Sequence, residues 1–166
     1  MANKHRIAAL AVVLTAGTVS AADPATFSLK MLTPETALKA AQAALAKCRA
    51  EGFQVAVAVA DRSGVTQVLL RDRFAGPHTV EMAQRKAWTA VSFRTSTADL
   101  DREMQPGRPA AGIRHLSNVI AVGGGVPIEA GGTTYGAIGV SGAPGSDSDD
   151  ACGRAGIKAI AESLEF

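Results

Sequence analysis

Histidine is the residue type in this chain best suited to bind a metal or transfer a proton near neutral pH. The sequence contains His5, His78 and His115. His78 follows Pro77 at the start of an expected helix, where an imidazole could ligate a metal or haem iron or donate to an anion. The alternative, which spacing alone favours, is that His78 caps or packs the turn. His115 lies beside Arg114 in a polar stretch, which favours a solvated side chain. His78 is therefore the main candidate for a functional histidine.

Three basic residues could converge near His78, namely Arg71, Arg73 and Lys86. They would do so if the end of a preceding β-hairpin faced the helix that follows Pro77. A cluster of this kind would suit a carboxylate or a haem propionate. Ordinary surface ion pairs are the alternative explanation for these charges.

The sequence does not match the known motifs for phosphate binding, serine nucleophiles, zinc or calcium. The run 123–125 is all glycine but continues as Val126-Pro127, so it is no phosphate-binding loop. Ser141 lacks the Gly-x-Ser-x-Gly spacing of a nucleophile elbow, and the chain has neither His-Glu-x-x-His nor Cys-x-x-Cys. The acidic run 147–150 resembles half a calcium loop without its later glycine and glutamate. We expect 145–150 to be a polar link whose acids are solvated at a helix N-terminus.

The first 22 residues have the order of a secretory signal peptide. Lys4 to Arg6 form a basic start, residues 7–19 form an apolar run of about a dozen residues, and small residues follow, so that cleavage after Ala21 or Ala22 is expected. The run is shorter than the roughly 20 residues that span a bilayer. We therefore expect a periplasmic or secreted protein that is not membrane-embedded, with an uncleaved anchor as the alternative.

Charge and length indicate one domain without affinity for nucleic acid. The chain has 17 Lys and Arg against 15 Asp and Glu, and loss of Lys4 and Arg6 leaves 15 against 15. No basic cluster remains to bind phosphate groups, so no nucleic-acid partner is expected. After a leader at 23–32, residues 33–166 are long enough to bury a core.

Cys48 and Cys152 are the two cysteines of the chain. An even number of cysteines in an exported protein favours a disulfide, here one that closes a loop of about a hundred residues. Two buried free thiols are the alternative.

The order of expected elements predicts a mixed α/β domain with a mainly antiparallel sheet, because strands do not alternate with helices. Thr33 and Pro34 suit the start of a first helix, and Ser96 with Asp99 fits a capping box. The expected helices cover 33–52, 79–93, 96–104 and about 150–165, and the expected strands cover 54–60, 65–71, 119–122, 126–128 and 133–141. Residues 105–115 are expected to form an exposed loop.

One side of the strand around 136–142 lacks large side chains, since Gly136, Gly139 and Gly142 recur along it. A strand face without large side chains allows another backbone or a ligand to approach closely. It could receive a neighbouring helix, another subunit or a flat ligand.

Several ordered motifs resemble the GlcG/HbpS family. They are the strand and turn V-A-V-A-D-R-S-G at 57–64, the hinge at 71–79, K-A-W-T-A at 86–90, G-G-V-P-I at 124–128 and G-A-I-G-V-S-G at 136–142. The resemblance covers about residues 33–165. The Met-Asp-Gly hinge common in the family is replaced here by Arg73-Phe74-Ala75-Gly76.

The resemblance implies a profilin-like α/β/α sandwich with a five-stranded antiparallel sheet, assembled into homo-oligomers. Several members of the family bind haem, and some act as extracellular sensors with a membrane sensor protein. Others accompany glycolate or diol metabolism, and one relative is the C-terminal domain of a cobalamin adenosyltransferase.

Three functions follow as hypotheses. The first is an exported, non-enzymatic haem-binding protein, with His78 as the iron ligand and Arg73 or Lys86 near the propionates. The second is an accessory enzyme or binding protein for a small organic acid, in which His78 and Lys86 bind the carboxylate or transfer protons. The third is an oligomeric scaffold without a ligand.

Overall fold

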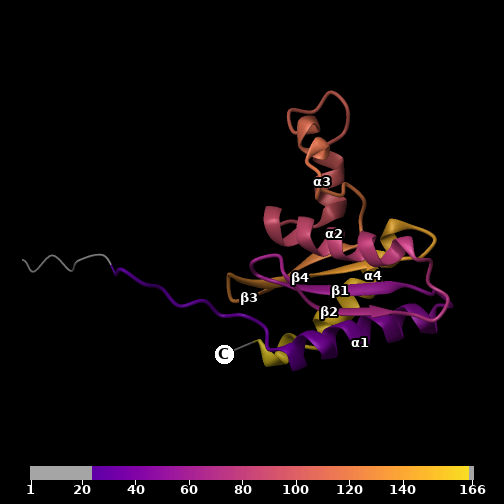
Figure 1. The fold of residues 1–166 in the computed structure, drawn as a ribbon, viewed down its shortest axis with the longest axis horizontal. Coiled ribbons are helices and arrows are strands. Elements are labelled where there is room, and N and C mark those ends of the chain that lie inside the picture. The colour runs from indigo at the N-terminus through magenta and orange to yellow at the C-terminus, as the bar shows by residue number, and fades with distance from the viewer. Residues whose placement is uncertain (1–23, 165–166) are drawn as a thin grey trace, which may run out of the picture.

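The computed structural model describes residues 24–164, so the expected signal peptide at 1–22 lies outside the described residues. The helices are α1 (Pro34–Ala50), α2 (His78–Phe93), α3 (Thr97–Glu103) and α4 (Ser146–Lys158), with short 3-10 helices η1 (Ala111–His115) and η2 (Ala161–Ser163). The strands are β1 (Ala56–Asp61), β2 (Thr66–Arg71), β3 (Gly125–Ala130) and β4 (Thr133–Ser141). They form one antiparallel sheet in the order β2-β1-β4-β3 (Figure 1).

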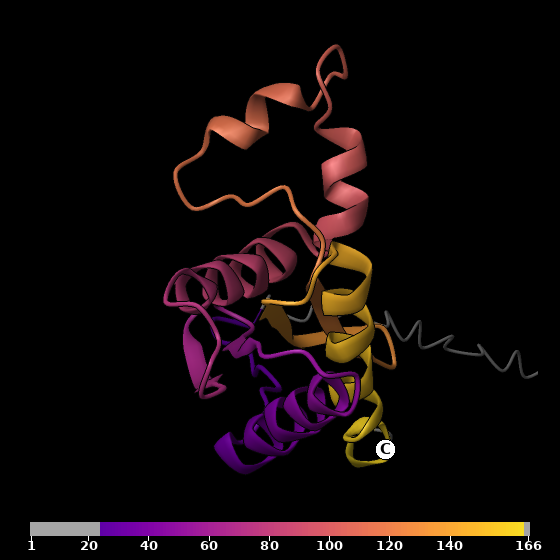
Figure 2. The same cartoon turned by 90° about the vertical axis from the view of Figure 1, so that its right-hand side faces the viewer.

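The sheet lies between two helical layers because both faces of β1 are apolar. Its neighbouring valines Val55, Val57 and Val59 pack into the main core with α1 and α4. Its alanines face the other way and pack against Ala83 and Ala87 of α2. Side chains alternate between the two faces of a strand, so a run of alternating valine and alanine has one bulky and one thin side. The α/β/α arrangement is visible in two views (Figures 1 and 2).

The expectation of five strands was wrong, because residues 119–122 do not form a strand. Val119 is buried against Leu100 and Met104 instead, and the backbone N–H of Ile120 donates to Thr89 Oγ1. Helix α3 contacts β3, the last strand of the sheet. Thr97 Oγ1 of α3 accepts the backbone N–H of Gly125 in β3 at 2.8 Å. Residues 97–122 thus project beyond α2 as a helical arm, in which η1 occupies part of the loop expected at 105–115 (Figure 1).

The acids of 147–150 lie at a helix N-terminus as expected, but the expected polar link does not extend to residue 150, because α4 begins at Ser146. Asp147 and Asp149 lie in the first turn of this helix, where negative charge is favourable. Asp149 is buried rather than solvated, with only 4% of its surface exposed.

The face of β4 that lacks large side chains packs against helix α2. A neighbouring helix was one of the three possibilities that the sequence left open. A Cβ atom added to Gly139 would lie 2.0 Å from the Ala83 carbonyl oxygen and 2.6 Å from the Ala87 nitrogen, both in α2. Only glycine therefore allows α2 to pack this closely on the sheet.

Gly139→Ala is expected to destabilise the protein by about 1–3 kcal/mol or more, because the added methyl group meets helix backbone and α2 must move away. Urea unfolding measures the change. Gly112→Ala is the matched control, since a Cβ atom there meets nothing within 4 Å. Equal stability of the Gly139 variant and the wild type would contradict this packing.

The expected disulfide is present and joins Cys48 of α1 to Cys152 of α4. Both residues are fully buried in the main core. The bond therefore ties together the two helices that cover one face of the sheet.

The hinge between β2 and α2 is fixed by a bidentate ion pair. Arg49 donates from Nε and a terminal nitrogen to the two oxygens of Asp72 at 2.7 and 2.9 Å. Asp72 is buried and also accepts the backbone N–H of Arg73. The hydrogen bonds from Arg49 hold the pKa of the Asp72 carboxyl below its usual range, against the opposing effect of burial.

This lowered pKa predicts a specific loss of stability in acid. An Asp with a depressed folded-state pKa stabilises the fold above its unfolded pKa of about 3.9, and that contribution disappears as pH falls through the folded pKa. Free energies of unfolding from pH 7 to 2 should therefore fall more steeply below about pH 4 in the wild type than in Asp72→Asn. Parallel curves for the two proteins would show that Asp72 is not responsible.

Candidate functional site

A pocket of about 420 Å³ lies between α2 and the segment that joins β4 to α4. Helix α2 contributes His78, Met82 and Lys86, which recur at four-residue steps on one helix face. The opposite wall and rim are Val122, Ser141, Gly142, Ala143, Pro144, Gly145, Ser146 and Asp149. The pocket thus combines an imidazole and a thioether with several apolar side chains.

His78 lies at the first residue of α2 and is exposed to solvent. Its ring lies over Gly76, because a Cβ atom on that glycine would approach His78 Cε1 to 2.7 Å and Nδ1 to 2.9 Å. The hinge is held by Thr79, whose hydroxyl donates to the Gly76 carbonyl oxygen at 2.6 Å. Within residues 24–164, neither ring nitrogen of His78 has a hydrogen-bond partner. Both nitrogens are thus free to bind a ligand.

Lys86 forms the inner wall of the pocket, and its side chain is only 2% exposed. The ammonium donates to Asp149 Oδ2 at 2.8 Å and to the Val140 carbonyl oxygen at 2.9 Å. Burial raises the pKa of the Asp149 carboxyl, while Lys86 and backbone N–H groups oppose that rise. A buried charge requires a partner, and each member of this pair supplies one to the other.

The wall opposite α2 is held by the first turn of α4. The second oxygen of Asp149 accepts the N–H of Ala143 at 3.0 Å. Asp150 accepts the N–H of Gly124, and burial raises the pKa of its carboxyl. Gly142 adopts φ of +133°, a conformation that L side chains rarely adopt. These contacts fix the backbone of the pocket without using His78.

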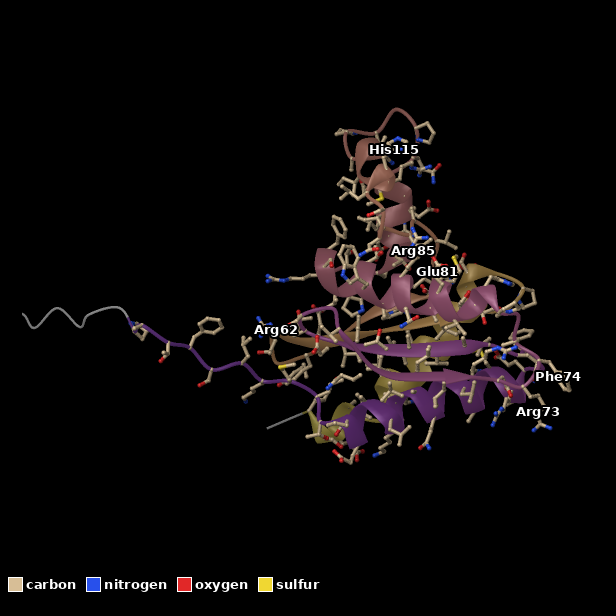
Figure 3. All side chains as sticks on the ribbon, in the orientation of Figure 1. Arg62, Arg73, Phe74, Glu81, Arg85 and His115 are labelled. Carbon is tan, nitrogen blue, oxygen red and sulfur yellow. A yellow bond between two sulfur atoms is a disulfide. The ribbon has the colours of Figure 1, made fainter. Side chains whose placement is uncertain are left out.

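The structure brings together two of the residues singled out in the sequence, His78 and Lys86, but Arg73 does not line the pocket. Arg73 and the 79% exposed Phe74 lie at the end of the molecule (Figure 3). The Arg71 guanidinium donates to the Ala75 carbonyl oxygen at 2.9 and 2.6 Å and so braces the hinge. His115 lies in the projecting arm, away from the pocket (Figure 3).

Sequence reasoning missed Met82 and Asp149. The spacing of His78, Met82 and Lys86 could have indicated a shared helix face. No local pattern in the sequence indicated a buried role for Asp149, because acidic residues at the start of a helix are usually solvated. Its pairing with Lys86 spans 63 residues and depends on the tertiary fold.

Residues 24–164 contain no group of three or more His, Cys, Asp and Glu side chains placed to hold a metal ion. A haem iron differs from such a site, since the porphyrin supplies most ligands and the protein needs only an axial one. Within the same residues, no helix is long and apolar enough to cross a membrane.

The family model described as haem degrading protein HbpS-like matches residues 32–158. The chain belongs to this HbpS-like family. A double mutant of Streptomyces reticuli HbpS is 37% identical and superposes with a TM-score of 0.78, covering 88% of this chain and 98% of that one. The resemblance seen in the sequence motifs is thereby confirmed.

Two further relatives connect the HbpS-like fold to PduO. A crystal structure described as a PduOC:haem complex is 30% identical, with a TM-score of 0.74 and coverage of 78% of this chain and 95% of that one. The corrinoid adenosyltransferase PduO of Citrobacter freundii is 37% identical over 98 residues, which are 57% of this chain. The chain spans only 29% of the length of that enzyme.

Proposed function

We propose that this protein is an exported haem-binding protein and that His78 is the axial ligand of the haem iron. The observation that carries the proposal is an exposed imidazole with two unpaired nitrogens at the edge of a pocket. Membership of the HbpS-like family and the haem complex of a relative support the choice of ligand.

The residues of the pocket fit a porphyrin in their chemistry. Met82, Val122, Ala143 and Pro144 offer apolar surface, and a thioether packs favourably against aromatic rings. Glycines 142 and 145 leave part of the wall without side chains. Bound haem would supply an iron centre for ligand binding or electron transfer, while the chain holds the imidazole and shields one side of the ring.

Arg73 is the proposed partner of a haem propionate. It lies in the hinge five residues before His78, and within residues 24–164 its side chain makes no hydrogen bond or ion pair. Lys86 is a less suitable partner than expected, because Asp149 and the Val140 carbonyl already engage its ammonium. We assign Lys86 to the pocket wall.

His78→Ala should remove the absorbance change that marks axial ligation of haem and weaken haem binding by at least about tenfold, since loss of a group that only orients a metal ligand already costs about 10–100-fold. The side chain is exposed and unpaired, so the variant should remain folded. Absorbance titration of purified protein measures both effects. His115→Ala is the matched control and should behave as the wild type; unchanged ligation in His78→Ala would remove His78 as the ligand.

The alternative of a small organic acid has weaker support. It needs Lys86 as a free cation or proton donor, and the structure pairs this residue with Asp149 at 2.8 Å. Of the groups invoked for that chemistry, only His78 is free to act.

Export to the periplasm or cell exterior, assembly into homo-oligomers and signalling through a membrane sensor protein are parts of the same proposal. The cysteine pairing is compatible with an oxidising compartment. Sequencing the N-terminus of the mature protein would test cleavage after Ala21 or Ala22.

A further inference from the structure

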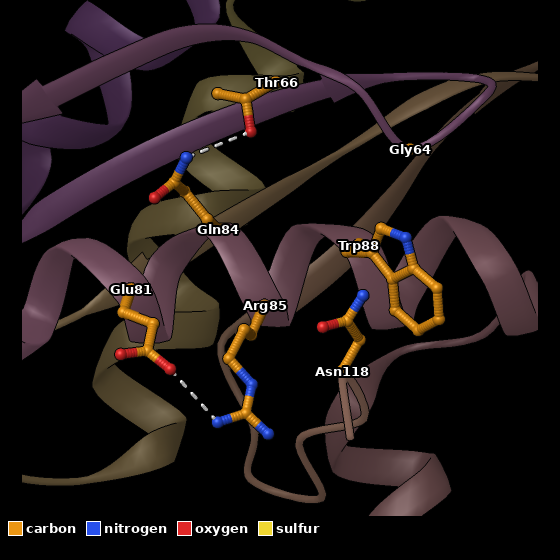
Figure 4. A pocket seen from close by; sticks show the side chains of 7 residues that line it. All are labelled: Gly64, Thr66, Glu81, Gln84, Arg85, Trp88 and Asn118. Carbon is orange, nitrogen blue, oxygen red and sulfur yellow. Dashed lines mark hydrogen bonds and ion pairs between the residues drawn. The ribbon is translucent and has the colours of Figure 1, made fainter. Parts of the chain in front are cut away.

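A second pocket, distinct from that of His78, lies on the neighbouring face of α2. It has a volume of about 260 Å³ and is lined by Gly64, Thr66, Glu81, Gln84, Arg85, Trp88 and Asn118 (Figure 4). Three segments meet here, namely α2, the β1–β2 hairpin, and the end of the projecting arm. The proposed haem site shares none of these residues.

The pocket is built around the single tryptophan of the chain. Trp88 packs partly against the cluster of Leu100, Met104 and Val119 in the arm. Gly64 also lies against the indole, since an added Cβ atom there would lie 2.9 Å from Trp88 Cδ1. Contacts from both the arm and the turn thus hold the indole in place beside the pocket.

Several polar groups in this pocket lack partners. Arg85 donates to the carbonyl oxygens of Ser117 and Val119 at 2.8 and 3.1 Å, yet its Nε is buried without a hydrogen bond. Within residues 24–164, the Asn118 amide and the indole N–H of Trp88 have no hydrogen-bond partner. Gln84 makes one long contact of 3.4 Å to Thr66 and leaves its amide oxygen open.

The charges of the pocket cancel. Glu81 and Arg85 form an i,i+4 pair at 3.4 Å, so the pocket contributes one negative and one positive charge and favours a neutral ligand. Its open groups are both donors and acceptors, which matches hydroxyl groups because each hydroxyl donates and accepts. The indole adds an apolar surface beside them.

We propose that this pocket binds a small neutral polyhydroxylated ligand of monosaccharide size. Its volume lies just below the roughly 300–1,000 Å³ of sites for drug-sized molecules, which favours one sugar ring over an extended chain. The ring's C–H groups would lie near Trp88, and its hydroxyl groups would bond to Asn118 and Gln84. This function is independent of haem binding.

The test uses glucose, galactose and mannose as separate probes against the haem-free mature protein. Because Trp88 is the only tryptophan, its fluorescence and its single indole N–H resonance in a nitrogen-15 NMR spectrum report on this pocket alone. At least one hexose should produce a saturable change at millimolar to tens of millimolar concentration. Asn118→Ala should weaken that binding about three- to tenfold, as expected for loss of a hydrogen bond.

Two controls make the result specific. Ser117→Ala changes the neighbouring exposed side chain and should bind like the wild type, as should His78→Ala, which alters only the other pocket. Asn118 is exposed and without hydrogen bonds, so its variant should fold, and the NMR spectrum verifies this. No saturable change with any of the three hexoses, or equal binding by the Asn118 variant, would overturn the proposal.

Discussion

Lys86→Met should destabilise the protein by about 3–5 kcal/mol, which is the usual cost of removing one partner of a buried ion pair. Methionine nearly fills the space of the lysine stem, so the loss comes mainly from Asp149. That carboxylate would remain 4% exposed without its ammonium partner, and the Val140 carbonyl oxygen would lose a hydrogen bond as well. Denaturant unfolding at neutral pH measures the change.

Two further variants separate this pair from ordinary charge effects. Lys47→Met removes the ammonium of an exposed pair with Glu51 and should cost less than about 1 kcal/mol. Lys86→Met combined with Asp149→Asn should recover part of the loss, because no buried charge is then left without a partner and the amide oxygen of asparagine can still accept the N–H of Ala143. A mild effect of Lys86→Met alone, similar to that of Lys47→Met, would contradict the buried pairing.

Replacing both cysteines by alanine should lower the free energy of unfolding by about 4–5 kcal/mol in the chain-entropy model. Cys48 and Cys152 are 104 residues apart in sequence, and a cross-link over a long loop restricts the unfolded chain strongly. Urea unfolding of Cys48→Ala/Cys152→Ala under non-reducing conditions measures the loss.

Reduction of the wild type provides the matched comparison. Its stability under a strong reductant should approach that of the double variant, since both lack the same cross-link. The reductant should leave the double variant unchanged. If the double variant were as stable as the oxidised wild type, the bond would not contribute to folding.

The sequence was most informative where local patterns coincide with packing. Thr33 caps α1 as expected, with its hydroxyl accepting from the N–H of Thr36, and Ser96 caps α3 in the same way. The strands expected at 54–60 and 65–71 are present as β1 and β2, and the alternating valines and alanines of β1 pack on opposite faces of the sheet. In each case the signal lies within a few residues and follows from backbone geometry.

The sequence was misleading where tertiary contacts outweigh local preference. Residues 119–122 were expected to form a strand because they are apolar. In the structure Thr89 Oγ1 accepts the backbone N–H of Ile120, and Val119 is buried among side chains of the arm. In α1 the large apolar side chain of Leu38 is 38% exposed, while the smaller Ala40 and Ala44 are fully buried. Ala40 and Ala44 lie close to Gly156 of α4, so small side chains allow the two helices to approach closely at this point.

The site was predictable only in part for the same reason. His78 stood out by residue type and by its position beside Pro77, and Lys86 by its charge within a family motif. Their common pocket depends on the segment 141–146 and on Asp149, which approach α2 only through the folding of β4 and α4. The Lys86 ammonium could be recognised as engaged only once that approach was visible.

Haem titration of the purified mature protein, followed by absorbance in the Soret region, tests the central claim most directly. The account predicts a saturable spectral shift at one haem per chain or fewer, and its loss in His78→Ala. A spectral change no larger than that of an unrelated protein would contradict haem binding. In that case membership of the HbpS-like family would describe the fold of this chain but not its ligand.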